Sequence, residues 1–459
     1  MSYKPRNFGK GSVEVESNPP QGQAATRRLA ITADKLVTQP FEGIDTVVDI
    51  LGYAARTHGT KNAMGWRDVV DIHEEEKDVK KTVGGKEVTE KKKWKYFQLS
   101  DYKYLNFLQV KDAVTEVSKG LLELDIGKDD IFNVYAQTRY VLNYMTYPSE
   151  LTEPHSFNWQ LMAFGCSCIS TAIATAYDTL GESGLTHSLN EPSCVGMFTN
   201  AELLPVVSRV LPNVPSLRVI IYDEKADPAV LESIKSAREG VKVLHIDELR
   251  ELGKVKAGEI PADRVPTPDR IACIMYTSGT TGAPKGVVIT QGNLVASVGA
   301  VYTLLGHLFI PGDSFLAYLP LAHILEYIVE LCLFFVGMTI GYGRVRTLTD
   351  QSVRKCKGDL SEFKPSIMVG VPAVWETIRK GIVGKINSTG TVKKSVFNGA
   401  MTVKRAGVPG LSQIVDNVVL AQVKAATGGR LRFALSGGAA LSKETQEFLN
   451  LALVTMLQG

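Results

Sequence analysis

The chain has 459 residues, more than one compact unit usually holds, so two or three lobes are expected. Hydrophobic residues make up 44% and charged residues 22%, with a mean hydropathy of +0.02, as in ordinary soluble globular proteins. A formal net charge of +3 without a long basic stripe excludes a nucleic-acid-binding surface of the usual kind.

The first part of the chain is polar and contains scattered glycine and proline. Residues 1–40 are therefore expected to form an extended N-terminal arm. The opening residues MSYKPRNFGKGSVEVESNPPQGQ contain no apolar run, so no secretory signal is expected. The six cysteines show neither a disulfide framework nor metal-binding spacing, and Cys273 and Cys332 lie in apolar runs. These features indicate a reduced, intracellular protein.

A charged region follows, in which acidic HEEEKD (73–78) precedes basic KKKWK (91–95). A Gly-Gly pair between them and alternation near Tyr96 predict a hairpin, and both charged clusters are expected to be solvated surface. Next, apolar residues recur at helical spacing and predict an amphipathic helix: Val110, Val114, Val117, Leu121 and Leu124.

From residue 194 onward, short β-rich runs alternate with helical segments. The runs are CVGMFT, LRVIIYD, VKVLHI, ACIMYT, GVVIT, SFLAYL, SIMVGV and LRFALSG. This alternation predicts βαβ units, parallel strands and more than one sheet, so the chain is expected to be mainly α/β.

The most apolar stretch, LCLFFVGMTIGYG (331–343), raises the question of a membrane span. His323, Glu326 and Glu330 interrupt the apolar residues before it. The uninterrupted run is shorter than the roughly 20 residues that a spanning helix needs. A buried helix followed by a buried strand is expected instead.

The loop YTSGTTGAPKG (276–286) lies between the apolar run IACIMY and the β-branched run VVIT, so it should connect two strands. Glycine lets backbone N–H groups approach an anion closely, threonine and serine add hydroxyl donors, and Lys285 adds a positive charge. Polyphosphate is the ligand that this composition favours. The loop does not have the spacing of a Walker A motif. A glycine-rich turn without a ligand is the alternative, and eleven specified positions argue against it.

The sequence YTSGTTGAPKGV resembles the phosphate loop of the adenylate-forming superfamily, which includes acyl-CoA synthetases, peptide-synthetase adenylation domains and luciferases. The resemblance places Thr277 near Mg²⁺ and the following residues around the β- and γ-phosphates of ATP. The nucleotide-binding residues that it implies are Thr277, Ser278, Gly279, Thr280, Thr281, Gly282 and Lys285. Of these, Thr280, Thr281 and Lys285 are also expected to be catalytic.

Three further segments resemble motifs of the same superfamily, in the same order along the chain. YLPLAHILE (318–326) implies that His323 lies at the wall between the nucleotide and the acyl pocket, with a catalytic role; a helix-capping histidine is the alternative. VGVPAVWE (369–376) resembles an acyl-pocket segment, although Trp375 could equally be a core anchor. LSGGAALS (435–442) implies nucleotide contacts. The residues concerned are Gly437, Gly438 and Ala439.

Tyr327, one turn after His323, sits where some long-chain members of the superfamily place an aromatic gate to the fatty-acid tunnel. An aromatic residue at this spacing is more often ordinary core packing.

NWQLMAFGC (158–166) and AYDTLGESGLTHSLNE (176–191) resemble eukaryotic, especially fungal, long-chain fatty acyl-CoA synthetases. The resemblance covers residues from about 40 to 459. It implies an AMP-binding domain over residues 41–459, formed by stacked βαβ sheets with an additional β element. A long-chain fatty acid, ATP, Mg²⁺ and CoA would be its ligands. The expected location is the cytoplasm, either free or in peripheral contact with the endoplasmic reticulum or lipid droplets.

The sequence is also compatible with two other functions. One is a ligase of the same family for a medium-chain, aryl or amino acid. The other is a non-catalytic remnant that binds nucleotide or lipid.

The sequence departs from the family pattern in two places. It ends at LALVTMLQG, before the residues that complete the metal site and before the small C-terminal domain, which is expected to be absent. This fragment is therefore expected to lack appreciable turnover. Residues 139–155, RYVLNYMTYPSELTEPH, have no counterpart in the family pattern and are expected to be a non-native insert.

Overall fold

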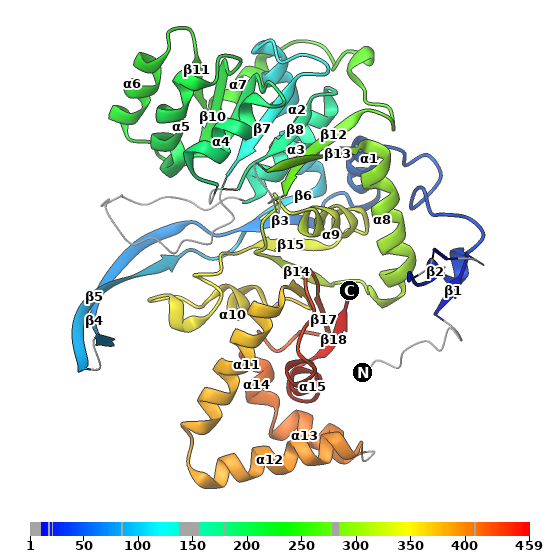
Figure 1. Cartoon of the computed structure of the whole chain (residues 1–459), viewed down its shortest axis with the longest axis vertical. Coiled ribbons are helices and arrows are strands. Elements are labelled where there is room, and N and C mark those ends of the chain that lie inside the picture. Colours follow the sequence, from blue (N-terminus) through cyan, green and yellow to red (C-terminus); the bar gives the residue numbers. More distant parts are fainter. Residues whose placement is uncertain are drawn as a thin grey trace.

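The computed structural model describes residues 11–16, 19–20, 22–83, 86–136, 156–177, 180–277, 284–407 and 410–459. Two seven-stranded sheets form its body, with helices between and around them (Figure 1). The arrangement confirms the expected α/β class with more than one sheet. The positions 139–155 and most of the phosphate loop lie outside the described residues.

The first sheet has the strand order β11-β10-β9-β7-β8-β12-β13. Its strands are β7 (Ile131–Tyr135), β8 (Ala172–Thr175), β9 (Gly196–Asn200), β10 (Val219–Asp223), β11 (Lys242–His245), β12 (Ile271–Thr277) and β13 (Lys285–Thr290). Neighbouring strands are parallel except for the antiparallel pair β12–β13 at one edge. Apolar, β-branched runs suit a sheet that helices cover on both faces.

The second sheet has the order β18-β17-β16-β14-β15-β3-β6. Its strands are β3 (Asn62–Trp66), β6 (Lys103–Asn106), β14 (Ser314–Ala317), β15 (Thr339–Tyr342), β16 (Ile367–Gly370), β17 (Phe433–Ser436) and β18 (Thr455–Gln458). It too is parallel apart from one edge pair, β3–β6. Every strand predicted after residue 194 is present in one of these sheets.

A layer of helices joins the two sheets. It comprises α1 (Val47–His58), α2 (Phe107–Glu123), α3 (Ser156–Cys168), α8 (Gln291–Leu305) and α9 (Ile324–Phe335). Helix α3 contacts β8 of the first sheet and β3 of the second, while α8 contacts β12 and α9 contacts β14. The predicted amphipathic helix is α2, whose apolar face is buried. The apolar stretch at 331–343 is a buried helix followed by a buried strand, as expected.

The remaining helices cover the outer faces. Around the first sheet lie α4 (Gly181–Asn190), α5 (Leu204–Val210), α6 (Pro228–Ala237) and α7 (Ile246–Val255). Beyond the second sheet lie α10 (Asp359–Phe363), α11 (Pro372–Asn387), α12 (Thr391–Ala406), α13 (Leu411–Val418), α14 (Ala421–Ala425) and α15 (Lys443–Ala452). Among the described residues, no helix combines the length and apolar character needed to cross a bilayer.

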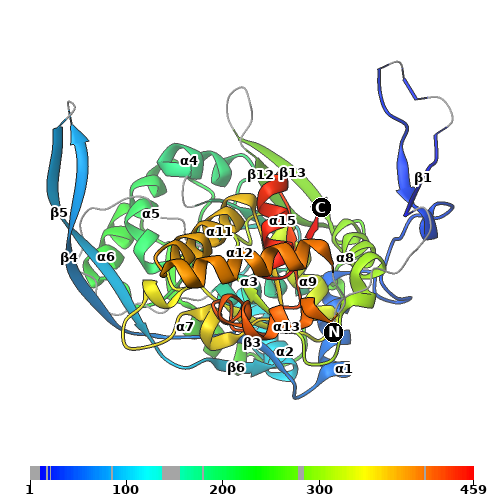
Figure 2. The same ribbon diagram turned by 90° about the horizontal axis from the view of Figure 1, so that it is seen from below.

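The predicted hairpin is confirmed and is longer than the sequence indicated. Strands β4 (Val69–Val83) and β5 (Lys86–Leu99) pair along their whole length and project from the body (Figures 1 and 2). The acidic and basic clusters lie opposite each other across the ribbon, as in the pairs Glu74–Lys95 and Glu76–Lys93. At the base, Phe97 packs in a small apolar cluster with Val353 from the loop before α10.

The N-terminal region contains a second, smaller ribbon. Strand β1 (Ser12–Glu14) pairs with β2 (Arg27–Leu29) in antiparallel fashion, and a 3₁₀ turn, Ala30–Thr32, follows. This ribbon stands apart from the two large sheets in both views (Figures 1 and 2). That residues 1–40 form an arm independent of the main domain remains a proposal.

The packing of α7 on α2 yields a stability prediction. A Cβ at Gly253 would lie 1.8 Å from the backbone oxygen of Glu116, so alanine cannot fit unless the helices separate. We expect Gly253→Ala to destabilise the protein by about 1–3 kcal/mol or more, through overpacking. Gly381→Ala in α11 is the matched control, because a Cβ there meets nothing within 4 Å. Thermal unfolding should show a lowered Tm for the first variant and an unchanged or raised Tm for the second; equal Tm values would contradict the packing argument.

Candidate nucleotide-binding site

The two ends of the predicted phosphate loop are held together by strand pairing. Thr277, the last residue of β12, pairs with Lys285, the first residue of β13, and its Oγ1 donates to the Lys285 carbonyl oxygen at 3.5 Å. The prediction that this loop connects two strands is therefore correct. The Lys285 side chain is exposed to solvent. The expected ligands between these ends lie outside the described residues: Ser278, Gly279, Thr280, Thr281 and Gly282.

Helix α4 contacts the chain on both sides of the loop. His187 Nε2 donates to the carbonyl oxygen of Pro284 at 2.9 Å, just before β13. Tyr276, which precedes Thr277 in β12, donates from its hydroxyl to Glu191 at 2.7 Å, and its ring meets that of His187 edge-on. Burial raises the pKa of Tyr276, and the Glu191 carboxylate raises it further, so the phenol stays a donor. We call His187, Glu191 and Tyr276 the stem clamp.

Sequence reasoning did not assign a role to the stem clamp. His187 and Glu191 lie in the segment 176–191, whose sequence indicated only the subfamily. Their spacing of four residues places them on one helix face, which the sequence does show. That this face meets both ends of the loop depends on the packing of α4, which periodicity alone does not give.

A second group of residues lies at the carboxyl ends of β14 and β17. His323 is the N-cap of α9, where its Nδ1 accepts from the Leu325 backbone N–H at 3.2 Å, and its side chain is exposed. A Cβ on Gly437 would lie 3.1 Å from the Leu325 side chain, so the turn after β17 packs against the first turn of α9. Gly438 has a φ of +80°, which favours glycine, and Gly438 and Ala439 are exposed. The structure therefore brings His323 and the glycine turn together.

A short path links this group to the phosphate loop. Met275 pairs with Thr175 across β12 and β8, two residues before Thr277. The Thr175 hydroxyl donates to the carbonyl oxygen of Ala322 at 3.5 Å, and Ala322 precedes His323. The carboxyl ends of the parallel strands in both sheets therefore approach each other here. Ligands of parallel α/β sheets bind at this kind of position.

The aromatic residues expected near an acyl pocket are core residues in this structure. Tyr327 is 1% exposed and packs edge-on against Trp159, with ring centroids 5.3 Å apart. Trp375 is fully buried beside Gly370, where an added Cβ would lie 2.7 Å from the Tyr318 hydroxyl. For both residues, core packing was one of the two roles predicted from the sequence, and both side chains pack in the core.

Two carboxyl groups lie buried on α9, next to these aromatics. Glu326 and Glu330 are each 1% exposed, and Tyr342 donates its hydroxyl to Glu330 at 2.7 Å. Burial raises the pKa of Glu330 to about 8, and burial together with the neighbouring Glu330 raises that of Glu326. The sequence showed these residues only as interruptions of an apolar run. In the fold, burial favours the protonated form of both carboxyl groups.

Comparison with known proteins identifies this arrangement. The family model described as AMP-binding enzyme matches residues 151–459, which include the phosphate loop, the His323 turn and the glycine turn. The chain belongs to the AMP-binding enzyme family.

Relatives within this AMP-binding family include fungal ligases. The chain is 41% identical over 449 residues to long-chain-fatty-acid–CoA ligase 1 of Schizosaccharomyces pombe, covering 96% of this chain and 63% of the relative. It is 37% identical over 471 residues to long-chain-fatty-acid–CoA ligase 1 of Saccharomyces cerevisiae, covering 98% and 64%. The chain thus spans a little under two thirds of the length of these relatives.

Solved structures of AMP-binding enzymes share the fold. The adenylation domain of a carboxylate reductase from Mycobacterium chelonae superposes with a TM-score of 0.66 at 16% identity, covering 92% of this chain and 60% of that one. A long-chain-fatty-acid–CoA ligase from Archaeoglobus fulgidus gives 0.58 at 14% identity, covering 91% and 62%. These matches confirm the predicted fold of an adenylate-forming N-terminal domain.

The raised pKa of Glu330 predicts how stability varies with pH. A carboxyl group whose pKa is higher in the folded state than in the unfolded state binds more protons in the folded state. Its contribution to the free energy of unfolding is therefore highest below pH 4.5 and falls as the pH rises towards about 8. Glu330→Gln keeps an acceptor for Tyr342 but removes this loss. The Tm of the variant should exceed that of the wild type by more at pH 8.5 than at pH 5, reflecting on the order of a few kcal/mol. Exposed Glu239→Gln is the control, and a Tm difference independent of pH would contradict the assignment.

Proposed function

We propose that the chain supplies the ATP- and acyl-binding part of a long-chain fatty acid–CoA ligase. The observation that carries this proposal is the juxtaposition of the Thr277–Lys285 loop ends with the His323 turn and the Gly437–Ala439 turn. The identity to fungal long-chain-fatty-acid–CoA ligases supports the substrate class. Fatty acid, ATP and CoA are the proposed substrates. A cytoplasmic location, peripheral to the endoplasmic reticulum or lipid droplets, is part of the same proposal.

The proposed reaction has two steps. The fatty-acid carboxylate attacks the α-phosphorus of ATP and pyrophosphate leaves, which forms the acyl-adenylate. The CoA thiol, on losing its proton, then attacks the acyl carbonyl carbon and AMP leaves. Negative charge builds on phosphate or carbonyl oxygens in both steps, so fixed hydrogen-bond donors supply much of the acceleration.

Each expected site residue has a role in this proposal. Lys285, Thr280 and Thr281 bind the β- and γ-phosphates, together with backbone N–H groups of Ser278, Gly279 and Gly282. The turn at Gly437, Gly438 and Ala439 lies beneath the adenine. His323 stands at the boundary between nucleotide and acyl chain, and its exposed, capped position leaves one ring nitrogen, Nε2, for a ligand contact.

We propose that magnesium binds at this site together with ATP, mainly through the phosphate oxygens. Among the residues that the structure describes, no group of three or more His, Cys, Asp or Glu side chains is arranged to hold a metal ion. Mg²⁺ prefers oxygen ligands and commonly binds phosphate oxygens with few protein groups. The Thr277 hydroxyl is the protein oxygen that we propose for it. When bound, the ion would neutralise charge on the phosphates.

Nucleotide binding by the loop is directly testable. Replacing both Lys285 and Thr281 with alanine removes one charge and one hydroxyl donor, so the Kd for Mg·ATP should rise by about tenfold or more. Isothermal titration calorimetry on the full 459-residue chain provides the measurement. Lys242→Ala, on the exposed edge strand β11, is the control. Equal affinity in the double variant and the wild type would rule out this loop as the phosphate site.

The stem clamp should act on ATP but not on AMP. Tyr276→Phe removes the hydroxyl that donates to Glu191, and His187→Leu removes the donor to Pro284. Because the loop contacts the β- and γ-phosphates, which AMP lacks, we expect weaker Mg·ATP binding, by about threefold to tenfold, with AMP affinity unchanged. His187→Gln, which keeps an N–H donor, should restore part of the loss. A parallel loss of ATP and AMP affinity would show a general structural role instead.

A further inference from the structure

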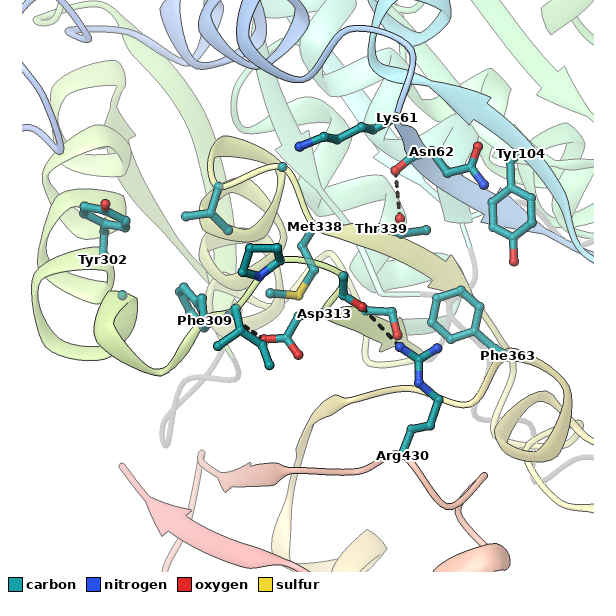
Figure 3. Close-up of a pocket in the computed structure, with 17 residues that line it drawn as sticks. Lys61, Asn62, Tyr104, Tyr302, Phe309, Asp313, Met338, Thr339, Phe363 and Arg430 are labelled. Carbon is teal, nitrogen blue, oxygen red and sulfur yellow. Dashed lines mark hydrogen bonds between the residues drawn. The ribbon is translucent and has the colours of Figure 1, made fainter. Parts of the chain in front are cut away.

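A pocket of about 890 Å³ lies at the amino-terminal edge of the second sheet, opposite the carboxyl edge that faces the phosphate loop (Figure 3). Its walls include Asn62, Ser314 and Thr339, which begin the parallel strands β3, β14 and β15. The His323 turn and the Gly437 turn follow the far ends of strands in this same sheet. One strand length, roughly 10 Å for four residues, therefore separates this pocket from that edge. We call it the amino-edge pocket.

The charged side chains that line the amino-edge pocket give it a net positive charge. Lys61 and Arg430 approach it from opposite walls (Figure 3). Arg430 donates to the Gly312 carbonyl oxygen at 3.2 Å, and in the described part of the chain neither side chain has a carboxylate within ion-pair distance. Among the described residues that line the pocket, Asp313 is the one carboxylate, and Arg432, which does not line the pocket, forms an ion pair with it.

Asp313 has no capacity left to neutralise the two cations. Its Oδ1 accepts from Ser366 at 2.7 Å and from Arg432 at 2.9 Å, while its Oδ2 accepts from the Ile310 backbone N–H at 2.9 Å and from a second N–H of Arg432. With its own charge matched by Arg432, it leaves the pocket with two uncompensated positive charges. An anion is the ligand that such walls favour.

Apolar side chains form the rest of the surface. Tyr302, Phe309 and Met338 lie on one side in Figure 3, and Phe363 lies towards the other. Met338 is 4% exposed and sits between the two cationic walls, and methionine adapts its shape to apolar ligands. The volume falls within the range of small-molecule sites. The ligand should therefore carry an apolar part as well as a negative charge.

We propose that the amino-edge pocket binds a single-chain amphiphile with an anionic head group, either phosphate or carboxylate. Lys61 and Arg430 hold the head, and the apolar part lies along Phe309 and Met338. This site is separate from the one proposed for catalysis and does not depend on it. A concave pocket between two walls suits one molecule at a time, so a lipid monomer, not a membrane surface, is the occupant.

The helices around this edge suggest a competing explanation. Helices α1, α8 and α9 end at His58, Leu305 and Phe335, near Lys61, Gly306 and Val336 of the pocket. Helix carboxyl ends carry partial negative charge, and the two cations could serve only to offset it. In that case their removal would lower stability without changing ligand binding, which separates the two explanations.

The test uses dodecyl phosphate below its micelle concentration, with inorganic phosphate and dodecanol as probes of head and chain alone. Calorimetry on the full chain should show binding of dodecyl phosphate and much weaker binding of the other two. Lys61→Gln with Arg430→Gln should weaken it about tenfold or more. Ile310→Asp, which places a negative charge on an exposed lining residue, should do the same.

Matched controls keep the proposal falsifiable. Leu304→Asp is equally exposed but does not line the pocket, and Lys242→Gln with Lys380→Gln removes two charges elsewhere; neither should change the affinity. Hydrogen exchange should slow at residues 306–313 on binding. Unchanged affinity in the Lys61/Arg430 variant, with or without a lower Tm, would overturn the proposal. Binding only to phosphatidate-containing vesicles, and not to the monomer, would overturn it as well.

Discussion

The parallel direction of the strands is the constraint on which this structure depends. In both large sheets all but one neighbouring pair run in the same direction, and the chain can join two parallel neighbours only by a crossover. Every crossover starts at the carboxyl edge. The His323 turn and the Gly437 turn begin such crossovers, whereas the phosphate loop leaves the same end of β12 and returns directly as the antiparallel strand β13. The Thr175–Ala322 hydrogen bond joins the edges of the two sheets.

The helices shared by the two sheets fix the position of one sheet relative to the other. Helices α2 and α3 pack so closely that a Cβ on Gly165 would lie 2.4 Å from the Val117 side chain. Burial of α9 is nearly complete and includes two carboxyl groups, which an apolar interior tolerates best in their protonated form. The loops at the carboxyl edges are thereby positioned by a dense core and not by their own contacts alone.

Much of this architecture could be predicted from local patterns. The runs around Ile220, Phe315 and Met368 are strongly β-branched or apolar, and each forms a strand with parallel neighbours on both sides. The eleven-residue loop sequence also indicated a phosphate site between two strands, and its ends confirm the connection. Local signals sufficed because each of these features is set by adjacent residues.

Other features depend on contacts between distant residues, which periodicity does not encode. The contact of His187 with Pro284 spans 97 positions, and the charges of Lys61 and Arg430 meet at one pocket from opposite ends of the chain. Tyr327 shows the same limit: its motif left both a gate and core packing open, and only the fold shows its ring packed against Trp159. Motif membership shows which segment a residue belongs to, but packing decides which way its side chain faces.

The projecting β4–β5 ribbon has two strand edges, and its charge pattern opposes their pairing with another strand. Glu74, Glu76 and Asp78 face Lys95, Lys93 and Lys91 on one surface, so the ribbon carries its own counterions. An incoming strand would have to approach along an edge lined with hydrated charges of both signs, and desolvating them would cost more than its backbone hydrogen bonds return. The charge pattern that favours hydration of the ribbon therefore also opposes the addition of a further strand to its edges.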